Sequence, residues 1–301
     1  MSIKSILITG STGFLGNIFY KHFKKTYKVS ELDKPDGIST IRLNEEVPKF
    51  HSYFDLVIHA AGKAHIMNNE INHNMMYDVN VGGTLNLLKG LENSFLPRSF
   101  VFISSVSVYG LDNGINISEH QPLNAKDVYG RSKIDAEKAV SDWCEKHSVI
   151  CTILRLPLIV GYDPPGNLRA MINSIRRGYY FNIDGGHTRK SMVLADDVAS
   201  IISNVSNIGG VYNLTDGYHP SFYEISSHIA SQLNKRKPSN IPRSLALVIA
   251  KVGDLIGAKA PINTIKFKKM TTDLTFDDSK AVIEIGWKPT PILECFNIIK
   301  P

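Results

Sequence analysis

The stretch SILITGSTGFLG, residues 5–16, decides the fold. An apolar run ends at Thr9, and glycines then recur as Gly10, Gly13 and Gly16. Glycine is needed where the backbone turns tightly and where a pyrophosphate approaches without a Cβ in the way. The helix expected after this turn offers free N–H groups to an anion. This strand-turn-helix context predicts a dinucleotide-binding loop that also includes Thr12, Phe14 and Leu15.

Strands and helices alternate along the first half of the chain. Apolar runs that predict strands cover residues 5–9, 27–32, 54–61, 99–105 and 149–156, and helical periodicity covers 14–25, 75–91 and 128–147. Strands that are apolar throughout must be covered on both faces, which is typical of a parallel sheet between helices. The pattern therefore predicts an α/β fold with a Rossmann-like, doubly wound parallel sheet. Pro35, Gly37 and Pro48 leave little room for a helix in one crossover.

After residue 157 the pattern loosens, and a smaller, mainly C-terminal substrate lobe is expected. We expect the dinucleotide-binding domain to cover residues 1–160, with 191–215 returning to it as a strand-helix-strand unit. Residues 161–190 and 216–301 would then form the substrate-binding lobe. The Gly- and Pro-rich stretch at 157–167 predicts the loop that leaves the sheet.

Composition is that of a soluble globular protein, with 301 residues, 43% hydrophobic and 21% charged. The N-terminus lacks the pattern of a signal peptide. The longest membrane-like stretch, SLALVIAKVGDLIG at 244–257, is interrupted by Lys251 and Asp254 and is shorter than the ~20 residues of a spanning helix. We therefore expect a cytoplasmic protein without membrane insertion. The three cysteines have no metal-ligand spacing.

A basic segment stands out within a net charge of +6. Residues 231–270 hold nine Lys or Arg against one acid, Asp254. This charge could belong to a solvated face, could steer a nucleotide, or could contact a membrane or polymer. Nucleic acid is not expected as a partner, because no zinc spacing, helix-turn-helix or basic-aromatic platform accompanies the charge.

Asp33 follows the second expected strand, where an acid bonds the ribose 2′-hydroxyl of NAD and repels the 2′-phosphate of NADP. The position therefore favours NAD. Lys34 beside it leaves NADP open, and Asp33 could also be a turn residue before Pro35.

The stretch DVYGRSK, 127–133, places Tyr129 and Lys133 four residues apart, on one face of an expected helix. A free phenol has a pKa near ~10, and an adjacent ammonium lowers it. Ser105 ends the fourth expected strand, at the edge where ligands of open α/β sheets bind. The three residues together predict an acid/base site that acts on a hydroxyl or carbonyl.

Seven ordered motifs resemble those of the extended short-chain dehydrogenase/reductase family, whose members mostly modify nucleotide-linked sugars. They are TGSTGFLG (9–16), HAAG (59–62), NVGGT (80–84), SSVSVYG (104–110), YGRSK (129–133), LRLPLIVG (154–161) and MVLADDVA (192–199). The likeness runs from about residue 4 to 200, with a weaker echo at 277–290.

The resemblance implies roles for particular residues. Catalysis would fall to Ser105, Tyr129 and Lys133, with Tyr129 and Lys133 also contacting the cofactor. Asn80 would brace the strand beneath the cofactor. Ser105, Ser107, Asn167, Leu168, Arg189 and Lys190 would contact a nucleotide-diphosphate sugar. A homodimer is expected. No metal is expected, because no carboxylate or cysteine is spaced with the histidines to bind one.

Three departures from the family pattern narrow the reaction. Lys190 stands where the family has an arginine on the substrate phosphate, so a point charge replaces a bidentate fork. Val106 and Ser107 stand where dehydratases carry an Asp-Glu pair, which disfavours elimination of water. Leu158 stands where galactose epimerases carry Asn, which disfavours simple UDP-galactose epimerisation.

Asp33 leans toward NAD and an epimerase, whereas Leu158 leans toward a reductase. A nucleotide-sugar epimerase with a transient 4-keto intermediate is favoured narrowly over a 4-keto-sugar reductase. A non-catalytic NAD(P)-binding sensor or scaffold is the third reading. His59, His65 and His73 are expected to be structural. The pairs Asp196-Asp197 and Asp277-Asp278 are expected to cap helices rather than to bind magnesium.

Overall fold

The computed structural model describes residues 3–32, 42–64, 70–257, 260 and 262–298. Its centre is a six-stranded sheet in the order β10-β6-β4-β3-β1-β2, and every neighbouring pair is parallel. The strands are β1 (Ser5–Thr9), β2 (Lys28–Glu31), β3 (Leu56–His59), β4 (Ser99–Ser105), β6 (Ile150–Leu156) and β10 (Gly210–Asn213). All five strands expected in the first half form, and the α/β, Rossmann-like fold is confirmed.

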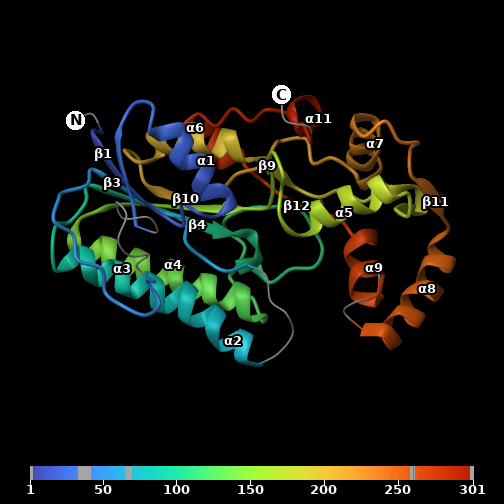
Figure 1. The fold of residues 1–301 in the computed structure, drawn as a ribbon, viewed down its shortest axis with the longest axis horizontal. Helices are drawn as coiled ribbons and strands as arrows, with labels where there is room; N and C mark the ends of the chain where they lie inside the picture. The colour runs from blue at the N-terminus through green and yellow to red at the C-terminus, as the bar shows by residue number, and fades with distance from the viewer. Residues whose placement is uncertain (1–2, 33–41, 65–69, 258–259, 261, 299–301) are drawn as a thin grey trace.

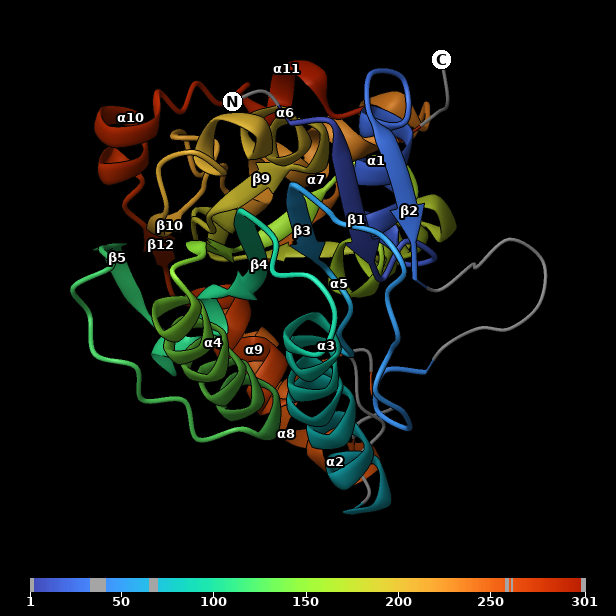
Figure 2. The ribbon, with the colours of Figure 1, turned by 90° about the vertical axis from the view of Figure 1, so that its left-hand side faces the viewer.

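Helices cover both faces of the sheet (Figure 1). α1 (Phe14–Phe23) packs against α6 (Ala195–Val205) on one face. α3 (Gly83–Glu92) and α4 (Val128–His147) pack together on the other, as Figure 2 shows end-on. Because the helices cover both faces of β1, β3 and β4, side chains on both faces are buried, which explains why these strands are apolar throughout.

The helix expected at 75–91 is interrupted. α2 (Glu70–Tyr77) runs into a π-helical turn, η1 (Asp78–Gly82), before α3 begins. Such turns insert a residue into a helix and often occur at functional sites. The crossover that was expected to be degenerate holds no helix over its described part, residues 42–55.

A smaller lobe extends from the carboxyl end of the sheet, on the right in Figure 1. Its elements are α5 (Gly166–Arg177), β8 (Phe181–Ile183), η3 (Asp184–Gly186), α7 (Phe222–Gln232), β11 (Ser239–Ile241), α8 (Arg243–Ile256) and α9 (Thr264–Thr271). β8 pairs with β11, and α5 packs against α7. The lobe has two small apolar cores of its own.

Three- and four-residue strands join the lobe to the sheet domain. β7 (Leu158–Val160) pairs with β9 (Met192–Leu194). β5 (Gly114–Ile117), which follows the short helix η2 (Val106–Tyr109), pairs with β12 (Leu274–Phe276) from near the C-terminus. The chain then ends with α10 (Ser279–Ile285) and α11 (Ile292–Cys295). Within the described ranges, no helix combines the length and apolar character that crossing a bilayer requires.

Candidate active site

The glycine loop after β1 is closely packed. Gly10 has φ +73°, and a Cβ there would lie 2.6 Å from the amide nitrogen of Ala61. A Cβ on Gly16 would lie 2.1 Å from the carbonyl oxygen of Gly10. Gly13 is the N-cap of α1 and leaves the amides of the first turn without a side-chain cap. The loop therefore requires glycine at Gly10 and Gly16 and presents a helix N-terminus to an anion.

A pocket of about 310 Å³ opens beside this loop. Its walls are Gly10, Thr12, Gly13, Arg42, Leu43, Asn44, Ala60, Ala61, Gly62 and Val79. The Leu15 side chain belongs to the core, so Leu15 can offer a ligand its backbone alone. Phe14 packs on the same core, with its ring next to Gly161. Asp33 lies outside the described residues.

Asn80, in the π-helical turn, makes three hydrogen bonds beside this pocket. Its side-chain oxygen accepts from the amide of Lys63 at 2.7 Å, and its amide group donates to the Lys63 carbonyl at 3.1 Å and to Ser132 Oγ at 2.9 Å. A Cβ on Gly62 would meet Asn80 Oδ1 at 3.2 Å. Asn80 thus ties the strand end at the pocket wall to α4.

Lys133 is buried on α4 and points to the carboxyl end of β4. Its Nζ donates to the carbonyl of Ile103 at 2.8 Å and lies 4.5 Å above the Phe102 ring. Burial lowers the pKa of Lys133 to about 8, and the nearby Glu137 carboxylate opposes this. The Nζ lies 3.5 Å from the position of a Cβ on Gly62, so the ammonium group reaches the pocket wall.

Tyr129 lies one turn before Lys133, beside Ser105. Asp127 caps α4 by accepting from the amide of Gly130 at 3.0 Å. Burial raises the pKa of Tyr129, the hydrogen bond with Ser105 lowers it, and Asp127 raises it further. Burial is the largest of these effects. The Lys133 ammonium donates to a strand carbonyl.

Ser105 and Ser107 form one hydroxyl pair at the end of β4. Ser105 Oγ accepts from the amide of Ser107 at 3.2 Å, which caps η2, and the two hydroxyls are 3.1 Å apart. A Cβ on Gly130 would lie 2.8 Å from the Ser107 carbonyl oxygen, so glycine lets α4 approach this turn. The geometry brings Ser105, Ser107 and Tyr129 together.

A buried ion pair behind these residues escaped the sequence reasoning. Glu137, one turn after Lys133 on α4, pairs with Arg155 of β6 at 2.7 Å, with both side chains almost fully buried. Glu137 also accepts from Ser104 Oγ at 2.5 Å. Arg155 donates to the Tyr109 hydroxyl at 3.2 Å. The i, i+4 continuation from Tyr129 and Lys133 to Glu137 is the signal that could have revealed it.

Four other residues expected on the substrate, Asn167, Leu168, Arg189 and Lys190, come from α5 and from the segment before β9. Asn167 is exposed in the first turn of α5, whereas the Leu168 side chain lies in the lobe's core and leaves its backbone for a ligand. Burial lowers the pKa of Lys190 to about 8, Asp273 and Asp112 oppose the shift, and Lys269 adds to it.

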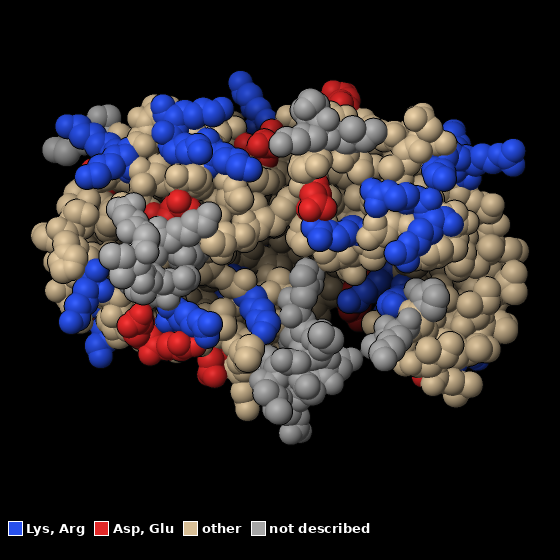
Figure 3. Space-filling model, viewed as in Figure 1, with Lys and Arg blue, Asp and Glu red and all other residues tan. Residues whose placement is uncertain are grey.

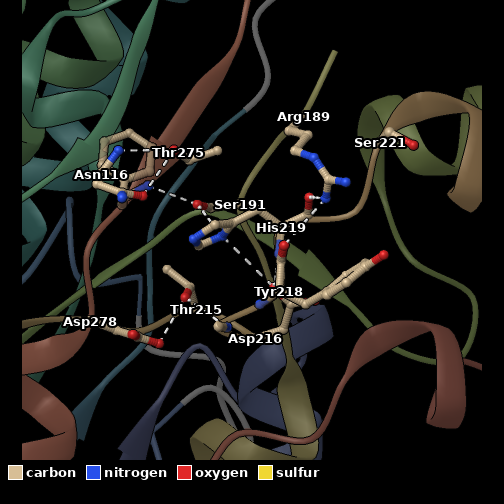
Figure 4. A network of polar contacts seen from close by, with 12 residues as sticks. Asn116, Arg189, Ser191, Thr215, Asp216, Tyr218, His219, Ser221, Thr275 and Asp278 are labelled. Carbon is tan, nitrogen blue, oxygen red and sulfur yellow. Dashed lines mark hydrogen bonds and ion pairs between the residues drawn. The ribbon is translucent and has the colours of Figure 1, made fainter. Parts of the chain in front are cut away.

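Arg189 is held by a turn that Figure 4 shows in close view. Its guanidinium donates to the carbonyl of His219 at 2.9 Å and lies over the Tyr218 ring. Asp216 holds the turn by accepting from the amide of His219 at 2.9 Å, and the His219 ring is 3.0 Å from Ser191 Oγ. Hydrogen bonds within this turn therefore fix the position of the exposed Arg189 guanidinium.

Of the three histidines expected to be structural, His59 has described partners. His59 is buried between the hydroxyls of Thr9 and Thr84, and burial lowers its pKa to about 3. His65 lies outside the described residues, and the His73 side chain is not described either.

Capping explains the aspartates only in part. Asp277 accepts from the amide of Ser279 at the start of α10, but Asp278 accepts from Thr215 and Asp197 accepts from Thr290. These two carboxylates join distant segments rather than cap their own helices. Among the residues described, no group of three or more His, Cys, Asp or Glu is arranged to hold a metal ion.

Comparison with known proteins identifies the class. Residues 6–214 match the model of the NAD dependent epimerase/dehydratase family. Since the match covers more than half of the chain, the protein belongs to this family and is an NAD-dependent enzyme of the nucleotide-sugar epimerase, dehydratase and reductase type.

Relatives of the chain include 4-epimerases. The N-acetyl-α-D-glucosaminyl-diphospho-ditrans,octacis-undecaprenol 4-epimerase of Escherichia coli O157:H7 is 27% identical over 92% of this chain and 88% of its own. The UDP-glucose 4-epimerase of Vibrio cholerae is 27% identical over 97% and 92%. A solved UDP-glucose 4-epimerase of Bifidobacterium longum, in complex with NAD⁺ and UDP, has a TM-score of 0.71, at 22% identity over 97% and 96%. The last likeness shows the shared fold.

Proposed function

We propose that this protein is an NAD-dependent nucleotide-sugar epimerase that works through a transient 4-keto sugar. One observation carries the proposal. Lys133 lies on the same helix as Tyr129, and its ammonium group reaches the wall of the glycine-loop pocket at Gly62. The pocket wall therefore lies against the helix that carries Tyr129, which supports a shared site. The cofactor residues proposed are Gly10, Thr12, Gly13, Phe14, Leu15, Gly16, Asp33, Asn80, Tyr129 and Lys133.

The chain's own residues supply proton transfer and positioning. Tyr129 takes the proton of the sugar C4 hydroxyl, and Ser105 holds that oxygen by a hydrogen bond. Lys133, whose pKa lies near 8, is still mainly protonated at neutral pH and favours the phenolate form of Tyr129 when the two groups approach. A bound nicotinamide dinucleotide supplies the hydride acceptor and donor. Tyr129 returns the proton once the sugar has been reduced on its other face.

The substrate side would hold the diphosphate. Arg189 and Lys190 supply positive charge, and Asn167 and the backbone of Leu168 supply the N-terminus of α5. Ser107 would share the sugar contact with Ser105, since their hydroxyls are 3.1 Å apart.

A 4-keto-sugar reductase uses the same three residues and is the alternative. The decisive experiment incubates the protein, without added cofactor, with UDP- and dTDP-sugars and identifies products by NMR. Interconversion of C4 epimers without consumption of NADH supports the epimerase. A strict need for NAD(P)H and a 4-keto substrate would replace it by the reductase. Tyr129→Phe is the control, and activity equal to the wild type in that variant would contradict the assigned role.

A lipid diphosphate is a second candidate for the group to which the substrate sugar is attached. The Escherichia coli relative acts on a sugar diphosphate linked to undecaprenol. The exposed apolar face of α8, described below, favours such a lipid-linked substrate for this chain too. The same NMR assay with a short-chain polyprenyl-diphosphate sugar separates the two carriers. A homodimer and a cytoplasmic location stay predictions, which sedimentation and cell fractionation can check.

A further inference from the structure

α8 turns large apolar side chains toward solvent. The helix spans the 14 residues Arg243–Ile256, and the small residues Ala246, Ala250 and Gly253 face inward. A Cβ on Gly253 would lie 1.9 Å from the carbonyl oxygen of Ile262, so this side packs backbone to backbone. The exposed large apolar residues of α8 are Leu245, Leu247, Val248, Ile249, Val252, Leu255 and Ile256.

The exposed residues form a continuous stripe. Leu245, Val248, Val252 and Leu255 follow one another at intervals of three and four residues, which places them on one face of a helix. Leu255 is 88% exposed and Val248 59%. Single exposed apolar residues are ordinary on protein surfaces, but a contiguous stripe marks an interaction surface.

The stripe lies in the most basic segment of the sequence. Residues 231–270 contain nine Lys or Arg and one acid, Asp254. Asp254 is engaged by the amide and hydroxyl of Thr264, at 3.0 and 3.1 Å. Figure 3 shows an expanse of uncharged surface at the lower right, where α8 lies in Figure 1, with Lys and Arg gathered next to it. A soluble protein partner would have to be both apolar and acidic, whereas an anionic bilayer offers both properties over any area.

We propose that α8 docks the protein on the surface of an anionic lipid bilayer. The helix is about 21 Å long at 1.5 Å per residue and would lie in the plane of the interface, with its stripe among the acyl chains. Arg243 and Lys251, which are both exposed on α8, would meet the phosphates of the headgroups. This assigns the basic segment to the membrane contact that its sequence had left as one of three readings.

Vesicle flotation of the full chain tests the proposal without any turnover. The probe is vesicles of phosphatidylcholine with phosphatidylglycerol, and vesicles of phosphatidylcholine alone are the comparison. We expect the wild type to float with the anionic vesicles and to be released in part by salt. The double variant Val248→Glu, Leu255→Glu should reduce the bound fraction by at least about tenfold, because acids replace the inserted side chains. Both sites are exposed, so folding should be unaffected.

Ile283→Glu is the matched control, since Ile283 on α10 is 82% exposed and lies outside the basic segment. This variant should float as the wild type does. The proposal is overturned if the wild type ignores anionic vesicles, or if the double variant floats equally well. Sedimentation that shows a wild-type dimer, split by the double variant and indifferent to vesicles, would instead assign the stripe to a second copy. None of these results depends on which sugar the protein converts.

Discussion

Lys133 and Lys190 lie in two different regions, yet burial lowers the pKa of both to about 8. Lys133 is fixed between a 20-residue helix and the central sheet, and its Nζ donates to a strand carbonyl. Lys190 lies between short strands and is surrounded by the charges of Asp273, Asp112 and Lys269. Under the proposed function, the sheet domain would fix the reacting groups, whereas peripheral segments would set the substrate contacts.

The largest loss of stability should follow from removing one partner of the buried Glu137–Arg155 ion pair. Glu137→Ala leaves Arg155 charged and unpaired in the interior, which costs about 3–5 kcal/mol of folding free energy. Urea denaturation of the variant and the wild type measures this loss. Asp142→Ala is the control on the same helix, since it removes the exposed Lys138–Asp142 pair and should leave the midpoint nearly unchanged. Equal effects in the two variants would show that the catalytic region is not held by this pair.

A second prediction concerns stability and pH at Lys133. Its folded pKa of about 8 lies below the ordinary 10.5, so between these values the unfolded chain binds more protons and stability rises with pH. Lys133→Met removes this dependence. The stability of the variant relative to the wild type should therefore be roughly 3 kcal/mol higher below pH 8 than near pH 10.5. Parallel stability curves across that range would mean that Lys133 is not buried as a charge.

The smallest change in free energy is expected for a substitution of Lys190, which is proposed to contact the substrate. Lys190→Met should raise KM for the nucleotide sugar by about tenfold, equivalent to about 1.4 kcal/mol, because a charge on the diphosphate is lost. The value of kcat should change little, since Lys190 does not touch the reacting carbon. Steady-state kinetics separates the two parameters. A fall in kcat at constant KM would move Lys190 to the catalytic region and remove the contrast with Lys133.

The sequence predicts the sheet domain well because its signals are local. The apolar runs and the glycine spacing at Gly10, Gly13 and Gly16 depend on neighbours in the chain. The strand pair β5–β12 was not predicted, since it joins short segments about 160 residues apart in the chain. The π-helical turn at Asn80 also escaped, because one inserted residue leaves helical periodicity nearly intact.

In the candidate site, too, local motifs predict some residues, and contacts between distant segments are missed. Ser105 and Tyr129 share a hydrogen bond, and Asn80 bonds to Ser132 on the helix that carries Tyr129. The Glu137–Arg155 pair could not be predicted with the same ease, because its partners come from separate elements and pair only after the sheet has formed. The exposure of α8 was equally hidden, since an apolar run reads alike whether it is buried or faces outward.

The central claim, hydride removal from C4 and its return to the same sugar, is tested most directly with a nucleotide sugar deuterated at C4. The account predicts that the epimerised product keeps the deuterium at C4, as NMR and mass spectrometry would show. A product that has lost the label to solvent, or an obligatory exchange with added NADH, would contradict it.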